Sequence, residues 1–310
     1  MIRRTSVVLA SLVVAFAVTA CLPPPAPPKP PVLAAACANT LVATTPGTVA
    51  SASLTEISGI VAGRRKAGVF WVHNDSGDTA RVFAVGADGR HLGEFALSGA
   101  TAIDWEDIAA GRGPVAGVAY LYLADIGDNA KARTSVRVYR VPEPLVDPAL
   151  PAGPPQTLTG VATLTFSYPD GPHDAEAFLV DPTSGELFIV TKDLVGGVAQ
   201  VFRAPANLAG GSTTALTQVA TVSLGFLHGV TGADVTPNGD VVALRTYVSV
   251  VLYPRASGQS LAQAFTQASC EGASSSSEPQ GEAIAFTRDG RGYVTVSEGV
   301  HPALHQFVAP

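Results

Sequence analysis

Short apolar segments alternate with polar turns along the chain, and the alternation recurs in five similar units. Each unit opens with an apolar segment that carries an acidic or hydroxyl residue, and a second apolar segment with a polar end follows it. The opening segments are Thr55–Ile60, Asp104–Ile108, Asp174–Phe178, Val230–Val235 and Gly281–Phe286. The second segments are Val69–Asp75, Tyr120–Asp125, Leu187–Asp193, Val241–Arg245 and Gly292–Glu298. Such a repeat is typical of folds that are built from small, similar sheets.

Turn signals and further strands complete the units. Asp88-Gly89, Asn238-Gly239 and Asp289-Gly290 favour the tight turns of β-hairpins. Third and fourth strands follow in most units, for example Arg81–Val85 and Leu92–Ala96 in the first. We find no sustained helical periodicity. The pattern therefore predicts an all-β fold, a five-bladed β-propeller of four-stranded antiparallel blades.

The two ends of the repeat region complement each other. The fifth unit stops after Leu304–Val308, one strand short of four. The unassigned segment Thr40–Thr44 near the N-terminus can supply the missing strand. We therefore expect an N-terminal strand to close the ring.

The first residues have the composition of an export signal. Arg3 and Arg4 precede an apolar run from Val7 to Ala17, so residues 1–20 read as a signal peptide. The tetrapeptide Val18-Thr19-Ala20-Cys21 resembles the lipobox of bacterial lipoproteins, in which the cysteine is acylated. The alternative is ordinary cleavage nearby. The resemblance implies an exported protein of the cell envelope that is lipid-anchored to the membrane through Cys21.

A proline-rich segment separates this region from the repeats. Residues 21–36 contain seven prolines, and such a sequence is typical of an extended spacer. The folded domain is then expected to span residues 37–310. If Cys21 carries lipid, Cys37 and Cys270 are the two remaining thiols, and an oxidising compartment favours a disulfide between them. Two unpaired buried thiols are the alternative.

Composition narrows the classes of partner. Hydrophobic residues make up 47% of the chain and charged residues 14%, which is enough apolar material for one large core. The net charge of −6 argues against a nucleic-acid partner. We expect a monomer that binds a small-molecule or glycan ligand and touches the membrane through its lipid anchor only.

The acidic and hydroxyl residues of the repeats share one position in the predicted fold. The first strand of each propeller blade lines the central channel, so these residues converge near the axis. The converging set is Glu56 or Ser58, Glu106, Glu176, Thr231 or Asp234, and Glu282. A wider ring at the channel mouth is expected from the ends of the second strands, comprising Asn74, Asp75, Asp125, Asp128, Lys192, Arg245 and Glu298.

Converging carboxylates must either take up protons or bind a cation. Oxygen ligands without histidine or cysteine suit calcium much better than zinc or copper. Magnesium is less apt, because it prefers few carboxylates and several waters. The sequence thus favours a calcium ion on the axis.

The motifs that carry these residues resemble those of the calcium-dependent apyrases, or calcium-activated nucleotidases, which are five-bladed propellers with one axial calcium. The resemblance implies one ligand per blade, at Ser58, Glu106, Glu176, Thr231 and Glu282. Thr231 departs from the serine of that family's pattern. The segments Trp71–Asp78 and Asp125–Asn129 also look like those of secreted bacterial propellers to which no reaction is assigned.

Two functions follow from this interpretation. The first is a calcium-binding cell-surface lipoprotein whose propeller binds a ligand. The alternative is an apyrase-like, calcium-dependent hydrolase of phosphate esters or anhydrides, in which Lys192 or Arg245 steadies the phosphoryl charge at the channel mouth. The sequence designates no catalytic residue, because it shows no assembled nucleophile and base. A lactone or sugar-ester hydrolase of the six-bladed type would need a sixth blade, which the repeats do not supply.

Overall fold

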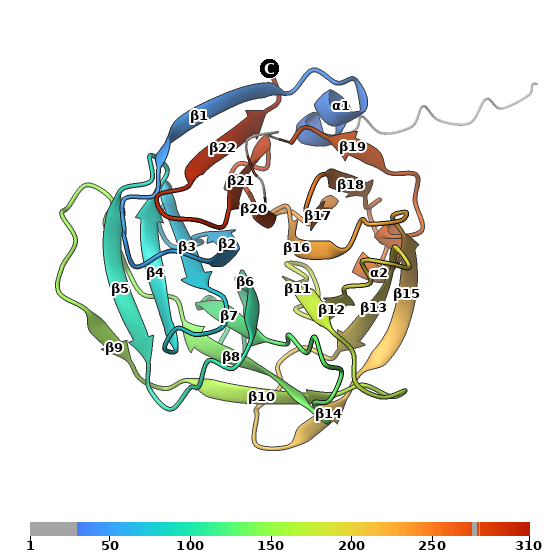
Figure 1. Ribbon diagram of the computed structural model, residues 1–310, viewed down its shortest axis with the longest axis horizontal. Coiled ribbons are helices and arrows are strands. Elements are labelled where there is room, and N and C mark those ends of the chain that lie inside the picture. The colour runs from blue at the N-terminus through green and yellow to red at the C-terminus, as the bar shows by residue number, and fades with distance from the viewer. Residues whose placement is uncertain (1–29, 275–277, 279) are drawn as a thin grey trace, which may run out of the picture.

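Five twisted sheets are arranged around a central axis in the computed structural model, which describes residues 30–274, 278 and 280–310 (Figure 1). The strands nearest the axis are β2 (Ile57–Ala62), β6 (Trp105–Arg112), β11 (Ala175–Val180), β16 (Val230–Val235) and β20 (Gly281–Phe286). Each of them contacts the inner strands of both neighbouring blades. The all-β, five-bladed propeller predicted from the repeats is confirmed.

The outer strands follow in chain order within each blade. Blade 1 continues with β3 (Val69–Asn74), β4 (Arg81–Gly86) and β5 (His91–Leu97), and blade 2 with β7 (Ala119–Asp125), β8 (Val136–Pro142) and β10 (Ala162–Ser167). Blade 3 continues with β12 (Leu187–Thr191), β13 (Val198–Ala204) and β15 (Thr217–Ser223), and blade 4 with β17 (Val241–Thr246), β18 (Val250–Pro254) and β19 (Cys270–Gly272). Blade 5 contains β21 (Gly292–Ser297), β22 (Ala303–Val308) and β1 (Val42–Thr48). Neighbouring strands named here pair antiparallel.

Two blades carry a fifth strand that the repeat pattern did not predict. β9 (Gln156–Leu158) pairs parallel with β5 of blade 1, although it lies in the connection between β8 and β10 of blade 2. β14 (Thr213–Ala215) leaves blade 3 and pairs parallel with β10 of blade 2. Both strands tie adjacent blades together at the outer rim. The connection that contains β9 also explains the long interval between the second and third repeats.

The core lies between the blades and comes from strands that are apolar on both faces. Every residue of β2, β11, β16 and β20 is buried, as expected for strands with a sheet on each side. Between blades 1 and 2 the fully buried Trp71 packs edge-on against Phe95, with ring centroids 5.3 Å apart. Both rings belong to blade 1 and lie in one cluster with Trp105 and Tyr139 of blade 2, so side chains of the two blades fill the space between them.

An N-terminal strand closes the ring, as the sequence predicted. β1 pairs antiparallel with β22, from Val42 opposite Val308 to Thr48 opposite Ala303. Blade 5 is therefore assembled from both ends of the domain (Figure 1).

A short helix precedes this closing strand. α1 (Pro31–Cys37) buries Val32 and Leu33 against blades 4 and 5, so these residues, which we expected in the proline-rich spacer, pack on the propeller. A run of small apolar residues after the last proline allows the helix, because Pro31 occupies its first turn, where no backbone donor is lost. A second helix, α2 (Leu261–Ala264), lies before β19.

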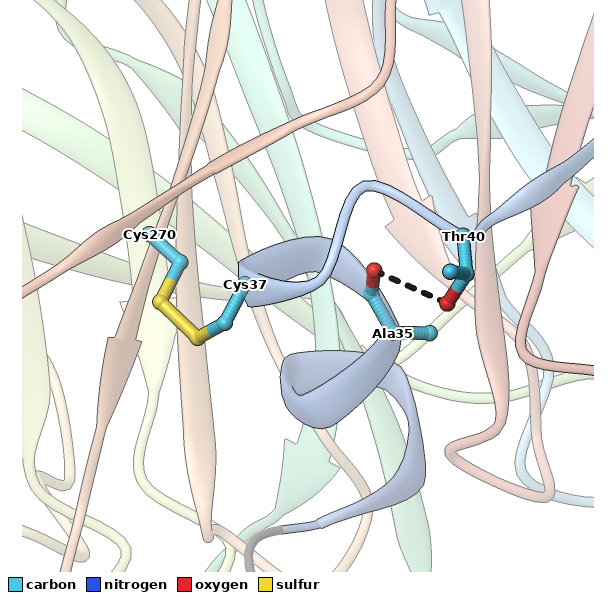
Figure 2. The surroundings of a disulfide bond; sticks show 4 residues. All are labelled: Ala35, Cys37, Thr40 and Cys270. Atoms are coloured by element: carbon cyan, nitrogen blue, oxygen red, sulfur yellow. Dashed lines mark hydrogen bonds between the residues drawn. A yellow bond between two sulfur atoms is a disulfide. The ribbon is translucent and has the colours of Figure 1, made fainter.

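A disulfide joins α1 to the outer strand of blade 4. Cys37 at the end of α1 and Cys270 in β19 are bonded, with Cα atoms 5.0 Å apart and a sequence separation of 233 (Figure 2). The Thr40 hydroxyl donates a hydrogen bond of 3.3 Å to the Ala35 carbonyl and so fixes the turn that follows the helix (Figure 2).

The expected signal peptide, Cys21 and most of the proline-rich spacer lie outside the described residues. Within the described part of the chain, neither helix has the length and apolar character needed to cross a membrane.

Candidate metal centre

Each inner strand begins with a β-bulge, and all five bulges fall at the same point of the blade. The pairing of β2 with β3 passes from Ile57 opposite Asn74 to Gly59 opposite His73 and leaves Ser58 unpaired. The other blades skip one residue in the same way. The skipped residues are Ser58, Glu106, Glu176, Thr231 and Glu282, the five that were predicted to ring the axis. All five side chains are buried. A bulge re-aims the side chain of its extra residue, which gives these five a common environment at one end of the inner strands.

The two hydroxyl residues of the ring link adjacent blades. Ser58 Oγ donates a hydrogen bond of 2.6 Å to the backbone carbonyl of Glu106, in the next blade. Thr231 Oγ1 donates one of 2.8 Å to the carbonyl of Gly281, again in the next blade. Both hydroxyl protons are thereby directed at the backbone, and the hydroxyl oxygens keep their acceptor lone pairs.

The three ring glutamates titrate at unusually high pH. Burial, and then the nearby Glu176 carboxylate, raises the pKa of Glu106 well above its ordinary value. Burial raises the pKa of Glu176 to about 7, although Lys192 opposes the shift. Burial and then Glu176 raise the pKa of Glu282 to about 8. Carboxylates held this close in a poorly solvated place favour either protons or a cation.

The tightest group of carboxylates lies on the side of blades 1 and 2. Asp75, Asp104 and Glu106 each offer one oxygen, and these oxygens lie within 4.8 Å of one another. Asp75 Oδ1 is buried and accepts no hydrogen bond in the described structure. Burial and then Asp75 raise the pKa of Asp104 to about 6. The structure thus contains a buried acidic cluster that could bind a metal ion.

Gly127 gives this cluster its room. A β-carbon at that position would collide with the carboxylates of both Asp104 and Glu106. Its backbone N–H donates to the Asp104 carbonyl at 3.2 Å, which holds the two chain segments together. Close backbone approach to a packed site is a common reason for glycine.

Asn74 and Asp128, which we expected at the channel mouth, hold the loops beside the cluster. Asn74 accepts hydrogen bonds from the backbone N–H groups of Thr55 and Glu56. Asp128 accepts from the N–H groups of Ala132 and Arg133. These two side chains are buried positioning groups and not open ligands.

Asp125 stands directly behind Asp104. Its Oδ1 accepts a hydrogen bond of 3.3 Å from the Asp104 backbone N–H and forms an ion pair of 2.9 Å with Arg133. Its Oδ2 is buried without a hydrogen-bond partner in the described structure. Asp125 therefore orients the cluster and adds negative charge to it.

Lys192 of blade 3 supplies a cation to the ring, and its charge acts on Asp75 and Glu106 of the cluster. Its ammonium forms a hydrogen-bonded ion pair with Glu176 and donates to the Tyr247 hydroxyl at 2.6 Å. Burial disfavours the charged ammonium, but Glu176 and Tyr247 more than offset this, so the pKa of Lys192 lies above its ordinary value. The carboxylate ring is thus partly neutralised by the protein itself, on the side of blade 3.

The strand register explains which mouth residues lie together. Asn74, Asp125, Thr191, Thr246 and Ser297 pair with the first residue of each bulge. The next residue along the chain is Asp75, Lys192, Tyr247 or Glu298 in four of the blades. Burial and then the negative charge of Asp75 raise the pKa of Glu298.

Arg245 does not lie at the channel mouth, where we expected it. In the register it pairs with Gly232, one place further from the mouth than Thr246, and its side chain is fully buried. There it forms an ion pair of 2.8 Å with the buried Glu278. Arg245 therefore cannot contact a ligand at the open rim.

Sequence reasoning missed three residues of the site: Asp104, Asp174 and Tyr247. The signal for the first two was the spacing Asp-x-Glu in Asp104-Trp105-Glu106 and Asp174-Ala175-Glu176. A regular strand already places residues i and i+2 on one face, and the bulge brings the second of them to the axis. Tyr247 carried no signal, because its contact with Lys192 joins two blades.

Two further acids serve structure deeper along the channel. Asp107 accepts hydrogen bonds from the backbone N–H groups of Phe178 at 2.8 Å and Ala233 at 3.3 Å, which belong to the next two blades. Asp234 accepts one of 2.7 Å from Phe286 N–H in blade 5. Asp234, which the sequence left as an alternative to Thr231, is therefore held by backbone donors.

Comparisons with known proteins yield no family. No family model and no curated protein matches the chain. Among solved structures, a gluconolactonase from Xanthomonas campestris is 11% identical with a TM-score of 0.45, over 82% of this chain and 72% of that one. The WD40 repeats of RRP9 are 10% identical with a TM-score of 0.44, over 87% and 100%. A putative 6-phosphogluconolactonase from Bacteroides uniformis is 14% identical with a TM-score of 0.41, over 84% and 69%. None of these three is an apyrase, and the resemblance to apyrases stays a prediction.

Proposed function

We propose that this protein is a calcium-binding propeller of the cell envelope that presents a ligand-binding site at the acidic end of its channel. The observation that carries the proposal is the group of Asp75, Asp104 and Glu106, whose carboxylate oxygens lie within 4.8 Å of one another. Calcium accepts several carboxylate oxygens with irregular geometry and needs no nitrogen or sulfur ligand.

The charges around the cluster support a divalent cation. Asp125 and Glu298 add negative charge, and the ammonium of Lys192 is already paired with Glu176. The hydroxyl oxygens of Ser58 and Thr231 donate their protons to the backbone, so they offer lone pairs. The remaining ring members, Glu176 and Glu282, would bind directly or through water.

The same site supports hydrolysis of phosphate esters less well. Arg245 is buried in an ion pair with Glu278 and cannot reach the rim. The ammonium of Lys192 is held by Glu176 and Tyr247. The Ser58 hydroxyl lies 3.4 Å from Glu106 Oε2, but its shorter hydrogen bond of 2.6 Å goes to the Glu106 backbone carbonyl, so the carboxylate is not its main acceptor. We therefore propose ligand binding, and not catalysis, as the function of this site.

Calorimetric titration of calcium into metal-free protein tests the proposal. We expect one high-affinity site in the wild type and a loss of roughly tenfold or more in affinity for Asp104→Asn and for Glu106→Gln, because each removes a charged ligand. The matched control is Glu271→Gln, which changes an exposed acid on the outermost strand of blade 4. Equal calcium affinity in all four proteins would exclude this cluster as the site.

A phosphate-release assay on nucleotides and phosphate esters separates the two functions. We expect no release above background, with calcium or with chelator. Phosphate release that depends on calcium and is lost in Glu106→Gln would show that the protein is a hydrolase and would contradict the proposal.

The place of the protein in the cell is part of the proposal. Acylation of Cys21 would hold the domain at the membrane, with the proline-rich segment as a spacer. Expressed in a bacterium that processes lipoproteins, the wild type should partition into detergent, and Cys21→Ala should appear in the aqueous phase. Identical partitioning of the two would contradict the anchor.

A further inference from the structure

A cavity of about 470 Å³ opens at the end of the channel opposite the acidic cluster. Its walls come from the loops that follow the inner strands, whereas the bulges lie at the beginnings of those strands. Blade 1 contributes Arg64, blade 2 the hairpin from Ala110 to Ala119, and blades 3 and 4 contribute Pro182 and Pro237. The cavity therefore lies between four blades, and no residue of it belongs to the proposed metal centre.

The lining is apolar except at one side. Val115, Val118, Pro182 and Pro237 offer aliphatic and ring carbons. Val115 is 54% exposed, so its side chain is open to the cavity. A ligand with an apolar body would cover this surface.

Arg64 is the cation of the cavity, and the protein holds it in place. The buried carboxylate of Glu143 accepts hydrogen bonds from the backbone N–H groups of Arg64 at 3.0 Å and Arg65 at 3.3 Å. The same carboxylate accepts a bond of 3.1 Å from the fully buried indole of Trp71. This clamp ties the loop of blade 1 to blade 2.

The guanidinium of Arg64 is oriented as well. Its Nε donates a hydrogen bond of 3.2 Å to the Ala110 carbonyl on the cavity wall. The hydrogen bonds of the described residues leave the two terminal nitrogens available to the cavity. Burial raises the pKa of Asp234 in the channel, and the positive charge of Arg64 opposes this effect. Arg112 is held at the rim by a bond of 2.6 Å to the Thr183 carbonyl and adds a second positive charge.

We propose that this cavity is a second binding site, for a small molecule that joins a carboxylate to an apolar body. The carboxylate pairs with the terminal nitrogens of Arg64, which suit the two oxygens of a carboxylate in one plane. The apolar body lies against Val115, Val118 and the two prolines. The two ends of the channel then have opposite preferences, a cation at the bulges and an anion at the loops.

Binding of 1-naphthaleneacetate, measured by calorimetry and by its fluorescence, tests the proposal. The neutral analogue 1-naphthaleneacetamide has the same apolar body without the charge. We expect the acetate to bind roughly tenfold or more tightly than the amide, because hydrogen bonds between two charged groups are stronger than those to a neutral group. Equal affinity for the two compounds, or binding of neither, would overturn the proposal.

Variants test whether the naphthalene compounds bind in this cavity. Arg64→Gln should abolish the preference for the acetate, and the control Arg90→Gln, an exposed arginine on the β4–β5 turn, should retain it. If Arg64→Gln does not fold, Ala116→Trp fills the cavity from an exposed loop position and should remove binding of both compounds. Normal binding in Ala116→Trp would place the compound elsewhere and refute the site. Asp104→Asn should leave acetate binding unchanged, so failure here is distinct from failure of the calcium proposal.

Discussion

At the scale of single residues, Asp107 shows how a buried acid can stabilise a propeller without a metal. Its carboxylate accepts backbone donors from Phe178 and Ala233, so one side chain joins three blades at the axis. Asp107→Ala leaves these buried N–H groups without an acceptor. We expect a loss of about 3 kcal/mol in the free energy of unfolding, because each orphaned donor costs about 1–3 kcal/mol. Urea denaturation measures it, and Glu271→Ala on the outermost strand should change little; equal stability of the two would refute the role.

A variant of Lys192 tests whether its ammonium competes with calcium for the ring carboxylates. Lys192→Met removes the charge that pairs with Glu176. Without calcium at pH 8 we expect a loss of about 2 kcal/mol, less than the full cost of breaking a buried pair because Glu176 can bind a proton. Calcium affinity should rise, since a repelling charge is gone. Lys66→Met, which removes an exposed lysine 3.9 Å from Asp147, is the matched control. Weaker calcium binding in Lys192→Met would show that Lys192 supports the metal site.

At the scale of strands and helices, the closure of the ring depends on the N-terminal segment. The disulfide between Cys37 and Cys270 closes a loop of most of the domain, with 233 residues of separation. Replacing both cysteines by serine should lower the free energy of unfolding by about 3 kcal/mol. In a domain of this size that corresponds to roughly 10 °C in melting temperature.

Thermal unfolding with and without reductant measures this effect. Reductant should lower the melting temperature of the wild type and leave that of the double serine variant unchanged. A wild type that is insensitive to reductant under unfolding conditions would contradict the contribution of the bond.

The elements also show what a sequence reveals and what it hides. The five bulged strands were predictable, because each repeats the same short motif with one polar residue. β9 and β14 were not, because each pairs with a blade other than its neighbours in sequence. Arg245 looked like a rim residue by its place at the end of an apolar run, but the strand continues to Thr246, and the Arg245 side chain is buried beside Glu278.

At the scale of the whole molecule, the acidic ring predicts how stability depends on pH. Burial raises the pKa of Asp104 to about 6, of Glu176 to about 7 and of Glu282 to about 8. The folded, metal-free protein therefore binds protons that the unfolded chain has already released. Its stability is highest below the ordinary carboxyl pKa and falls as the pH rises through 6 to 8.

Other groups act outside this window. Burial lowers the pKa of His73 to about 4. Its contribution to the free energy of unfolding therefore rises with pH and is complete near the ordinary histidine pKa of 6.5. The carboxyl of Asp181 is buried, but hydrogen bonds from Arg255 and its neighbours outweigh the burial and lower its pKa, so it titrates in acid. Between pH 6.5 and 8.5 the carboxyls with a raised pKa dominate, which include the ring glutamates and Asp107, whose pKa burial raises well above its ordinary value.

We therefore expect the metal-free protein to lose stability between pH 6.5 and 8.5, by up to about 1.4 kcal/mol per pH unit for each proton that the folded state retains. Calcium needs the ionised carboxylates, so its affinity should rise over the same interval and the calcium-bound protein should change less. Urea denaturation at pH 6.5, 7.5 and 8.5, with chelator and with calcium, measures both trends. A metal-free protein that becomes more stable as the pH rises would show that the ring carboxylates are ionised without a cation, and the physical reason for a metal at the axis would be lost.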